Sequence, residues 1–296
     1  MRADLHFHSR YSDGSLWPNE LAQIAKNKGL EIVALTDHDT FDGVNDFLVA
    51  TEKLDIVGIP AIEINFVDTE FGFNSELLAY FPKGKFENTY KFLSYYQGLR
   101  RKVAEQAIVK ARSLFNIPNL NIDELIELKI GSNQLKFLHN KISLTRRDIY
   151  TYLCDKNVSH GFANFQDFKN YFFNTPEFIE LSVYPELVKC IESVKSDGGY
   201  SVIAHPAYQF NKDVIKIREG ENKYKENLIK AKQIGLWGIE MHSYDSISEA
   251  SVLNEIFSEF ANECGLNLTF GSDFHSQNLK TWRELDCLNG DFHGFK

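Results

Sequence analysis

The chain contains 296 residues, of which 43% are hydrophobic and 25% charged, so it is long enough to bury a substantial core. Asp and Glu total 41 against 32 Lys and Arg, which gives a formal charge of -9 at pH 7. This balance argues against a general basic surface of the kind that attracts long nucleic acid or an anionic membrane. An anionic ligand must therefore be held locally, for example by metal ions.

No segment is predicted to cross a membrane or to direct export. Apolar runs such as Ile56 to Ile64 are short, and the first residues pass directly into strand-like sequence, so we expect a cytoplasmic protein. The chain has four cysteines: Cys154, Cys190, Cys264 and Cys287. They lack the C-x-x-C spacing of thiolate zinc sites, and their spacing is not typical of a disulfide framework. Nitrogen and oxygen would therefore be the ligand atoms of any bound metal.

The first eighty residues alternate strand-like and helical patterns. Pro18 suits the first turn of a helix and Gly29 suits the end of that helix. This alternation is typical of βα units around a parallel sheet. The predicted elements are a strand at Ala3 to His8, a helix from about Pro18 to Lys28, a strand at Glu31 to Thr36, a helix after Asp42 and a strand at Ile56 to Phe66.

The middle of the chain has a different character, with long helical stretches and no strand pattern between them. These stretches are Lys91 to Phe115, Arg146 to Lys156 and Asn164 to Phe173. After about Pro185 the alternation returns, with helices at Leu187 to Lys195, Lys225 to Gln233 and Ile247 to Cys264, and strands at Tyr200 to Ala204, Leu236 to Met241 and Leu266 to Phe270.

This order predicts an α/β barrel that is interrupted by a helical insertion. The barrel would comprise residues 1–82 and 184–296, and the insertion, residues 83–183, would form a cap.

Two histidines lie two residues apart on the first predicted strand. Side chains at this spacing project to one face, so His6 and His8 can direct their imidazoles to a common point. Asp13 follows on a loop at the strand end where α/β barrels build their sites. A core histidine with a turn Asp before Gly14 is the structural alternative, and for an isolated H-x-H pattern it is equally plausible.

The second and third strands also end in ligand-type residues. His38 lies between Asp37 and Asp39, either of which could orient its imidazole, although a helix-capping role is an alternative for Asp39. Glu63 is the one carboxylate in an apolar strand, where an unpaired charge would be costly, so it is expected to bind a cation unless it lies at an exposed strand end.

Strands in the second half repeat this pattern. His205 ends one strand, and Asp273 and His275 follow the last one. Ligand-type side chains at five equivalent strand ends are difficult to explain as separate core histidines, so we predict that they converge on one metal site.

These segments resemble the polymerase and histidinol phosphatase (PHP) domain family, a family of metal-dependent phosphoesterases. The matching motifs are DLHFHSRYSDG, LTDHDT, the strand ending in AIE, AHP and GSDFH. The resemblance implies a distorted seven-stranded (β/α) barrel that holds two or three divalent ions. Mixed histidine and carboxylate ligands suit Mn²⁺, Fe²⁺ or Zn²⁺.

The resemblance also implies how the ligands are shared. It places His6, His8, Glu63 and Asp273 on one metal, and Asp13, His38 and His275 on a second. Glu63 would bridge to a third metal that is completed by His205 and by Glu76, which stands where the family usually has histidine.

Asp13 and the segment from Ser143 to Ile149 resemble the family branch that acts on nucleotides or trims oligonucleotides. By this resemblance Arg146 faces substrate phosphate, although Arg147 and Asp148 depart from the family's Pro-His. A solvated helix-end arginine is the alternative. His242 also ends a strand, where it would bind substrate or donate a proton to the leaving oxygen, or be merely a polar strand end.

The expected activity is a metal-dependent phosphoesterase in which metal ions activate the attacking water. The candidate reactions are removal of the 3'-phosphate from 3',5'-nucleoside bisphosphates and 5'-to-3' hydrolysis of short oligonucleotides. A histidinol-phosphate type phosphatase and an inactive metal-binding regulatory module are the alternatives. The expected partner is a small phosphorylated substrate. His139, His160 and His293 have no partners in sequence and are predicted to lie at the surface.

Overall fold

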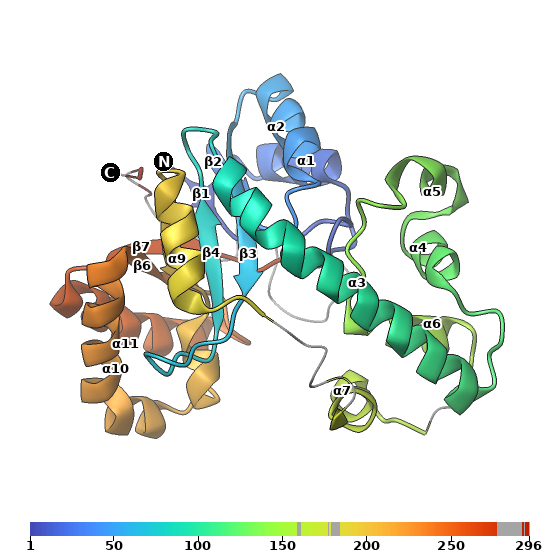
Figure 1. Cartoon of the computed structure of the whole chain (residues 1–296). Helices are drawn as coiled ribbons and strands as arrows, with labels where there is room; N and C mark the ends of the chain where they lie inside the picture. The colour runs from blue at the N-terminus through green and yellow to red at the C-terminus, as the bar shows by residue number, and fades with distance from the viewer. Residues whose placement is uncertain (159–160, 177, 179–183, 277–291, 293, 296) are drawn as a thin grey trace.

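A computed structural model of the chain describes residues 1–158, 161–176, 178, 184–276, 292 and 294–295 (Figure 1). Its centre is a seven-stranded sheet in which the strands follow one another in chain order. All neighbouring pairs are parallel except those of β4, which runs antiparallel to both neighbours. The strands are β1 (Ala3–Asp4), β2 (Ile32–Leu35), β3 (Val57–Asn65), β4 (Glu76–Tyr80), β5 (Tyr200–Ile203), β6 (Leu236–His242) and β7 (Asn267–Gly271).

The chain beyond β1 and β7 closes this sheet into a barrel. The backbone N–H of Leu5 donates to the carbonyl of Phe270 at 3.1 Å, and the N–H of Asp273 donates to the carbonyl of His6 at 2.7 Å. β1 is shorter than predicted because the Asp4 side chain accepts the backbone N–H of His6, which a continuing strand would direct to its neighbour. The predicted distorted seven-stranded α/β barrel is confirmed.

Alternation along the strands separates two hydrophobic cores. In β3, Ile59 and Ala61 pack inside the barrel, whereas Ile62 and Ile64 pack against the helices outside it. Successive side chains of a strand point to opposite faces, so Glu63 follows Ala61 on the inner face, toward one end of the barrel. The strand pattern therefore carries this carboxylate into the interior.

Five helices cover the outside of the barrel (Figure 1): α1 (Pro18–Asn27), α2 (Val44–Lys53), α9 (Leu187–Ser196), α10 (Val214–Ile234) and α11 (Ile247–Cys264). α10 begins eleven residues before its predicted start. The Asp213 side chain caps its first turn by accepting the N–H groups of Ile215 and Lys216. Gly220, which interrupts the helical pattern in the sequence, lies where an added Cβ would come within 3.1 Å of the Phe210 ring. Close packing thus explains a glycine inside this helix.

α3 (Glu87–Phe115) leads from the barrel into the predicted insertion. It begins beside α9 and extends to four further helices on one side of the molecule (Figure 1): α4 (Ile122–Ile130), α5 (Ser132–Leu138), α6 (Arg146–Asp155) and α7 (Phe165–Phe173). α4 and α5 were not predicted from the sequence. These helices bury a separate aromatic cluster that includes Phe168, Phe172 and Phe178. None of the helices among the described residues is long and apolar enough to cross a membrane.

Gly271 lies where β7 approaches the segment after β1 most closely. A Cβ at this position would lie 2.2 Å from the Cβ of His6 and 2.7 Å from its backbone nitrogen. We therefore expect Gly271→Ala to destabilise the fold by at least about 1–3 kcal/mol through overpacking, measured as a lower thermal unfolding midpoint.

Gly98→Ala provides the matched control for this experiment. Gly98 lies within α3 with no neighbour within 4 Å of an added Cβ, so alanine should be neutral or stabilise the helix by about 0.5–1 kcal/mol. Equal unfolding midpoints for the two variants would contradict the close approach of Gly271 and His6.

Candidate metal centre

The sheet register brings the predicted ligands to one end of the barrel. His38 pairs with Glu63 in an isolated parallel bridge beyond β2. On the other side, Phe7 pairs with Phe274, which places the histidines flanking Phe7 next to Asp273 and His275. Four segments that are remote in sequence therefore deliver their polar side chains to the same edge.

The reversed direction of β4 adds a residue from a strand start. Glu76 is the first residue of β4, and because β4 runs antiparallel this start lies at the edge where the parallel strands end. The N–H of Ala204 donates to the carbonyl of Glu76 at 2.9 Å, which aligns Glu76 with the neighbouring His205. The predicted pairing of these two residues is thus present in the structure.

A first group of ligand atoms is formed by His6, His8, Glu63 and Asp273. The Nε2 atoms of His6 and His8 lie 3.2 Å apart. Each Nε2 lies 3.1–3.4 Å from Glu63 Oε2 and from Asp273 Oδ1. Ligands at about 2.0–2.2 Å from a tetrahedral ion lie roughly 3.3–3.6 Å apart, so these separations fit a bound divalent metal.

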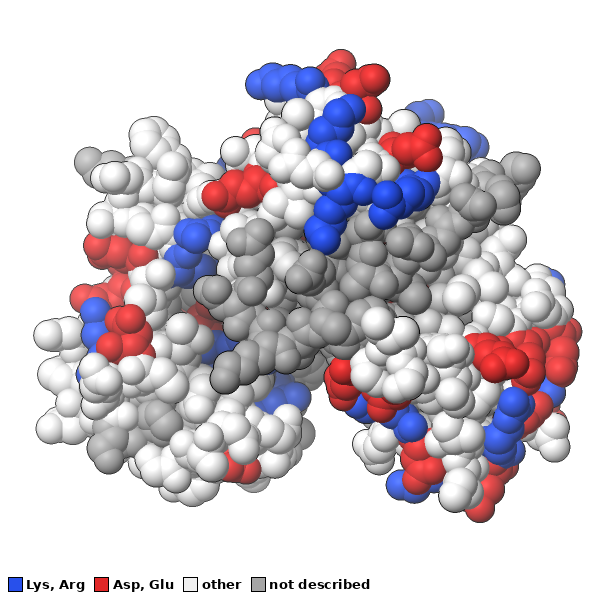
Figure 2. Space-filling model, turned by 180° about the vertical axis from the view of Figure 1, so that it is seen from behind, with Lys and Arg blue, Asp and Glu red and all other residues white. Residues whose placement is uncertain are grey.

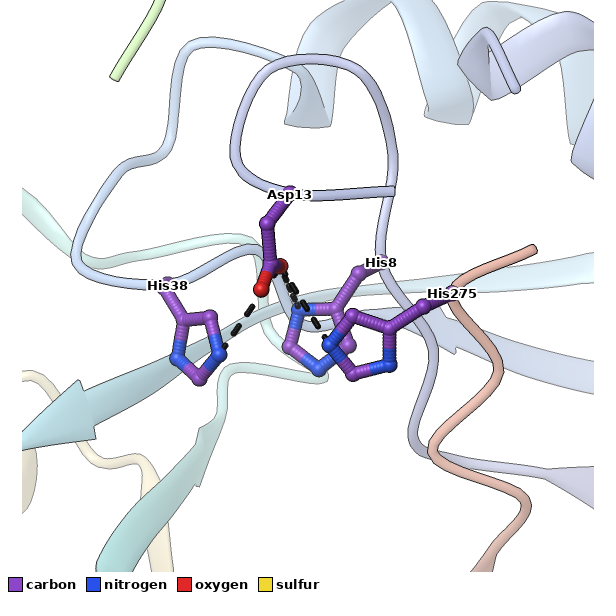
Figure 3. A group of neighbouring side chains, drawn as sticks. All are labelled: His8, Asp13, His38 and His275. Carbon is purple, nitrogen blue, oxygen red and sulfur yellow. Dashed lines mark ion pairs between the residues drawn. The ribbon is translucent and has the colours of Figure 1, made fainter. Parts of the chain in front are cut away.

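A second group surrounds Asp13 (Figure 3). The Oδ1 atom of Asp13 faces three imidazoles, with His275 Nε2 at 3.3 Å, His38 Nε2 at 3.8 Å and His8 Nδ1 at 3.8 Å. Figure 3 shows the three rings directed toward the carboxylate from separate parts of the chain. The structure therefore brings together Asp13, His38 and His275 as predicted.

Glu63 joins these groups to a third. Its Oε1 lies 3.0 Å from His205 Nε2, while its Oε2 lies 3.1 Å from His38 Nδ1. Glu76 Oε2 lies 3.1 Å from the same His205 nitrogen. Since both oxygens of Glu63 face imidazoles of different groups, the carboxylate has the geometry of a bridging ligand.

Several buried polar atoms of this cluster have no hydrogen-bond partner. They include His8 Nδ1, Asp13 Oδ1, His38 Nδ1 and His205 Nδ1. Buried polar atoms are nearly always satisfied, and leaving one unsatisfied costs about 1–3 kcal/mol. The donor set and these unsatisfied atoms fit divalent cations that are held by nitrogen and oxygen ligands.

The electrostatics of the cluster also favour positive charge. Burial lowers the pKa of His6, but the charges of Glu240 and Glu63 outweigh it and raise this pKa well above 6.5. Burial likewise raises the pKa of Glu63, yet the imidazoles of His6 and His38 keep it well below 4.5. Carboxylates that stay ionised while fully buried are strong ligands for a cation.

Glu240 is a buried residue of this site that sequence reasoning missed. Its Oε1 lies 2.7 Å from His6 Nδ1, and its Oε2 accepts the backbone N–H of His205 at 2.7 Å. The pKa of Glu240 falls to about 2 because His6 and His242 outweigh the effect of burial. A carboxylate within the apolar strand LWGIEMH was the available signal, by the same reasoning that singled out Glu63.

The acidic neighbours of His38 do not orient its imidazole as predicted. Asp37 instead accepts hydrogen bonds from Ser9 and Ser12, with the Ser12 hydroxyl at 2.5 Å. Asp37 thereby fixes the loop that carries Asp13. Asp39 accepts from Asn65 and forms an ion pair with Arg100.

Two site residues adopt a left-handed backbone conformation that is uncommon outside glycine. His205 has φ 29° and Asp273 has φ 52°. Such conformations are costly and cluster at functional sites, where the surrounding contacts hold them.

Part of the cluster lines a cavity of about 660 Å³, and we call this part the floor: Asp13, His38, Glu63, Glu76, His205, Asp273 and His275. Basic residues of α3, α6 and α7 line the same cavity, and we call these the cationic wall: Arg100, Arg146, Arg147 and Lys169. Arg146 was predicted at the site, and Arg100 and Lys169 were not. His242 is fully buried beside Glu240 and is not among the residues that line the cavity.

Some of the remaining histidines and cysteines lie outside the described part of the chain. His139 lies beyond α5, where its Nε2 pairs with Asp123 at 2.7 Å. Among the described residues, Cys154, Cys190 and Cys264 form no disulfide. His160, His293 and Cys287 lie outside the described residues.

The sequence model of the PHP domain matches residues 4–241. The chain belongs to the PHP domain family. It is therefore a metal-dependent phosphoesterase, and the resemblance noted in its sequence motifs is confirmed.

Similar proteins cover nearly the whole chain. A 5'-3' exoribonuclease of Haemophilus influenzae is 26% identical over 92% of this chain and 89% of its own length. A phosphoribosyl 1,2-cyclic phosphate 1,2-diphosphodiesterase of Eggerthella lenta is 24% identical over 94% of this chain and 95% of its own. A candidate metal-dependent phosphoesterase of Bifidobacterium adolescentis has the same fold, with TM-score 0.72, 21% identity and coverage of 94% and 89% of the two chains.

Glu240→Gln should weaken metal binding while preserving the fold. The amide keeps the size of the side chain but loses the charge that holds the His6 ring, and such changes behind a ligand typically cost about 10–100-fold in metal affinity. Calorimetric titration of the metal-free protein with Mn²⁺ measures this affinity. Glu255→Gln, at an exposed position of α11, is the control, and equal affinities for both variants would contradict this role of Glu240.

Proposed function

We propose that the chain hydrolyses phosphate esters of nucleotides. The observation that carries this proposal is one cavity that is lined both by imidazoles and carboxylates and by the cationic wall. We place two or three divalent ions on the ligand sets described above: His6, His8, Glu63 and Asp273; Asp13, His38 and His275; and Glu63, Glu76 and His205.

Each part of the cavity then has a separate task. When bound, the metal ions supply Lewis acidity and lower the pKa of water. Glu240 holds the His6 ring through Nδ1, which leaves Nε2 directed toward Glu63 and Asp273. Arg146 lines the cavity and is suited to bind phosphoryl oxygens through its planar fork of donors. The buried position of His242 favours a role in supporting neighbouring imidazoles over proton donation to a leaving group.

The substrates that we propose are a 3',5'-nucleoside bisphosphate, which would lose its 3'-phosphate, and short oligonucleotides cut from the 5' end. The name of the Haemophilus relative supports the second substrate. A cavity of about 660 Å³ suits a nucleotide or the end of a short oligonucleotide. The excess of acidic residues over the chain disfavours long nucleic acid.

We also propose that residues 83–183 act as a cap on the barrel. Their helices have their own aromatic cluster and contribute the cationic wall, so the insertion would supply substrate contacts while the barrel supplies the metal ligands.

Glu63→Gln should abolish hydrolysis. The variant removes the charge that faces imidazoles of all three groups, and since metal catalysis contributes several kcal/mol, turnover should fall at least about a hundredfold. Phosphate release from adenosine 3',5'-bisphosphate and nucleotide release from a dinucleotide, both with Mn²⁺, measure this effect. The substrate panel should include a ribose cyclic phosphate, because of the Eggerthella relative.

The exposed Glu70→Gln is the control, and far-ultraviolet circular dichroism checks that the fold is kept. Chelation of the wild-type protein should abolish hydrolysis reversibly. Persistent activity in chelated Glu63→Gln protein would refute the metal-dependent mechanism.

Arg146→Met should mainly weaken substrate binding. Losing a charge-assisted contact to phosphate costs about 1.5–3 kcal/mol, so we expect KM to rise at least about tenfold with a smaller change in kcat. Arg101→Met is the control, because Arg101 of α3 is not among the residues that line the cavity. A fall in kcat with unchanged KM would instead place Arg146 at the reacting group in the transition state.

A further inference from the structure

The loop that carries Asp13 is held from two sides, and we call its residues 9–15 the ligand loop. On the barrel side, Asp37 fixes it through the hydrogen bonds described above. On the other side, the backbone N–H of Ser143, in the cap, donates to the carbonyl of Tyr11 at 2.9 Å. Figure 1 shows this stretch of chain, between β1 and α1, on the side of the barrel nearest α4 and α5. Asp13 therefore lies on a loop between the barrel and the cap.

Apolar packing joins the same loop to the cap. The side chain of Tyr11 is buried in a cluster with Ile126 and Ile130 of α4 and with Ile142. Burial of apolar surface is favourable but non-directional, so it holds the two parts together without fixing their exact positions. Hydrogen bonds must supply that precision.

Arg10 connects both ends of the ligand loop to α4. Its Nε donates to the carbonyl of Ser15 at 2.7 Å, across the turn that contains Asp13, and its Nη1 donates to the carbonyl of Lys129 at 3.3 Å. Lys129 is the last residue but one of α4, where backbone carbonyls lack partners within the helix and favour a cation. The loop therefore contacts the cap through its backbone and through a charged side chain.

Lys129 also connects this contact to α6, which lines the cavity. Its side chain is 9% exposed, and its Nζ donates to the carbonyl of Ser143 at 2.9 Å and to Asp148 Oδ2 at 3.1 Å. Ser143 is the donor to the ligand loop, and Asp148 lies in the first turn of α6, which begins at Arg146. One ammonium group thus holds both the residue that bonds to the ligand loop and the start of the helix that lines the cavity.

General charge attraction does not explain how the cap is held. Figure 2 shows a notch between two lobes of the molecule, and on the described part of that face Lys and Arg are interspersed with Asp and Glu, so that neither sign dominates the view. Lys129 differs from such exposed charges because it is nearly buried. Removing an ammonium from water is costly unless its partners compensate, so the contacts of Lys129 fix one specific arrangement.

Resting on the ion proposed for the group around Asp13, we propose that Lys129 is a positioning residue that couples the cap to this metal site. With the cap in place, Lys129 and Ser143 hold the ligand loop so that Asp13 faces the imidazoles of its group. An ion at Asp13 in turn favours this position of the loop and the cap, because coupling between two sites is reciprocal. The contact that completes the metal site is then the one that brings Arg146 to the cavity.

Metal titration of the full chain tests this coupling without any substrate. Calorimetric titration of the metal-free protein with Mn²⁺ is compared for the wild type, Asp13→Ala and Lys129→Met. Asp13→Ala identifies the binding step that belongs to its group. Lys129→Met should weaken that step about fivefold or more and change the other steps less than about twofold. In the double variant Lys129→Met should have no further effect, because the ligand that it positions is absent.

Two further lysine variants separate positioning from folding. Lys156→Met removes an exposed lysine of the same cap, at the end of α6, and should leave every Mn²⁺ step unchanged. Lys129→Arg keeps a charged donor and should restore part of the affinity that Lys129→Met loses. The unfolding midpoint of each variant is measured in parallel. Equal weakening of all steps in Lys129→Met, or no change in the step assigned to Asp13, would overturn the coupling.

Hydrogen exchange tests the coupling without a cap variant, and it therefore decides if Lys129→Met does not fold. Mn²⁺ should slow amide exchange in residues 142–148 of the wild type about fivefold or more, but not in Asp13→Ala. A segment that only packs against the barrel would exchange at the same rate with and without the ion. That result would contradict the proposal.

The coupling and the proposed function can fail independently. Coupled metal binding in a protein that hydrolyses neither the nucleotide nor the dinucleotide would support the coupling and refute the proposed function. Hydrolysis of these substrates together with unchanged Mn²⁺ binding in Lys129→Met would do the reverse. If Asp13→Ala alters no binding step, the ligand group around Asp13 and the coupling are both wrong.

Discussion

The central constraint in this structure is a carboxylate held inside the barrel and surrounded by imidazoles. Glu63 is 1% exposed, and its two oxygens lie within 3.3 Å of nitrogens from His6, His8, His38 and His205. A buried charge costs several kcal/mol unless it is compensated. Barrel closure between β1 and β7 supplies part of this compensation by bringing His6 and His8 opposite β3. The site and the topology therefore depend on each other.

Strand direction explains why one ligand comes from an unexpected place. In parallel α/β barrels, functional residues gather where the strands end. This rule identifies His38, Glu63, His205 and Asp273 from the sequence, but it gives no reason to examine the start of a strand. Glu76 satisfies the same geometry because β4 is reversed, so that its first residue lies at the common edge. Only the family resemblance pointed to this residue, since a five-residue strand carries no sequence signal of its direction.

Most ligands placed by strand register were predictable from the sequence, whereas Arg100 and Lys169 on the helices were not. The H-x-H pair and Glu63 were predicted because side chains alternate between the two faces of a strand. The structure keeps this alternation, although β1 is shorter than predicted. Arg100 and Lys169 lie on helices rich in polar residues, where a basic side chain is usually solvated. Their place at the cavity depends on how α3 and α7 pack, which involves contacts distant in sequence. Glu240 has the same sequence signal as Glu63, which is a single charged residue in an apolar strand. Only Glu63 was identified from this signal.

The arrangement of charge also shows why net charge is a poor guide to ligand class for this fold. Most charged side chains among the described residues are at least partly exposed, and exposed charges farther apart than about a Debye length of 8–10 Å are largely screened. Inside the cavity, screening is weaker, so a few oriented groups determine which ligand is favoured. The acidic floor favours metal cations, and the cations of α3, α6 and α7 line the same cavity. An acidic protein can therefore form a local site with both signs of charge, because the barrel supplies the carboxylates of the cavity and α3, α6 and α7 supply its cations.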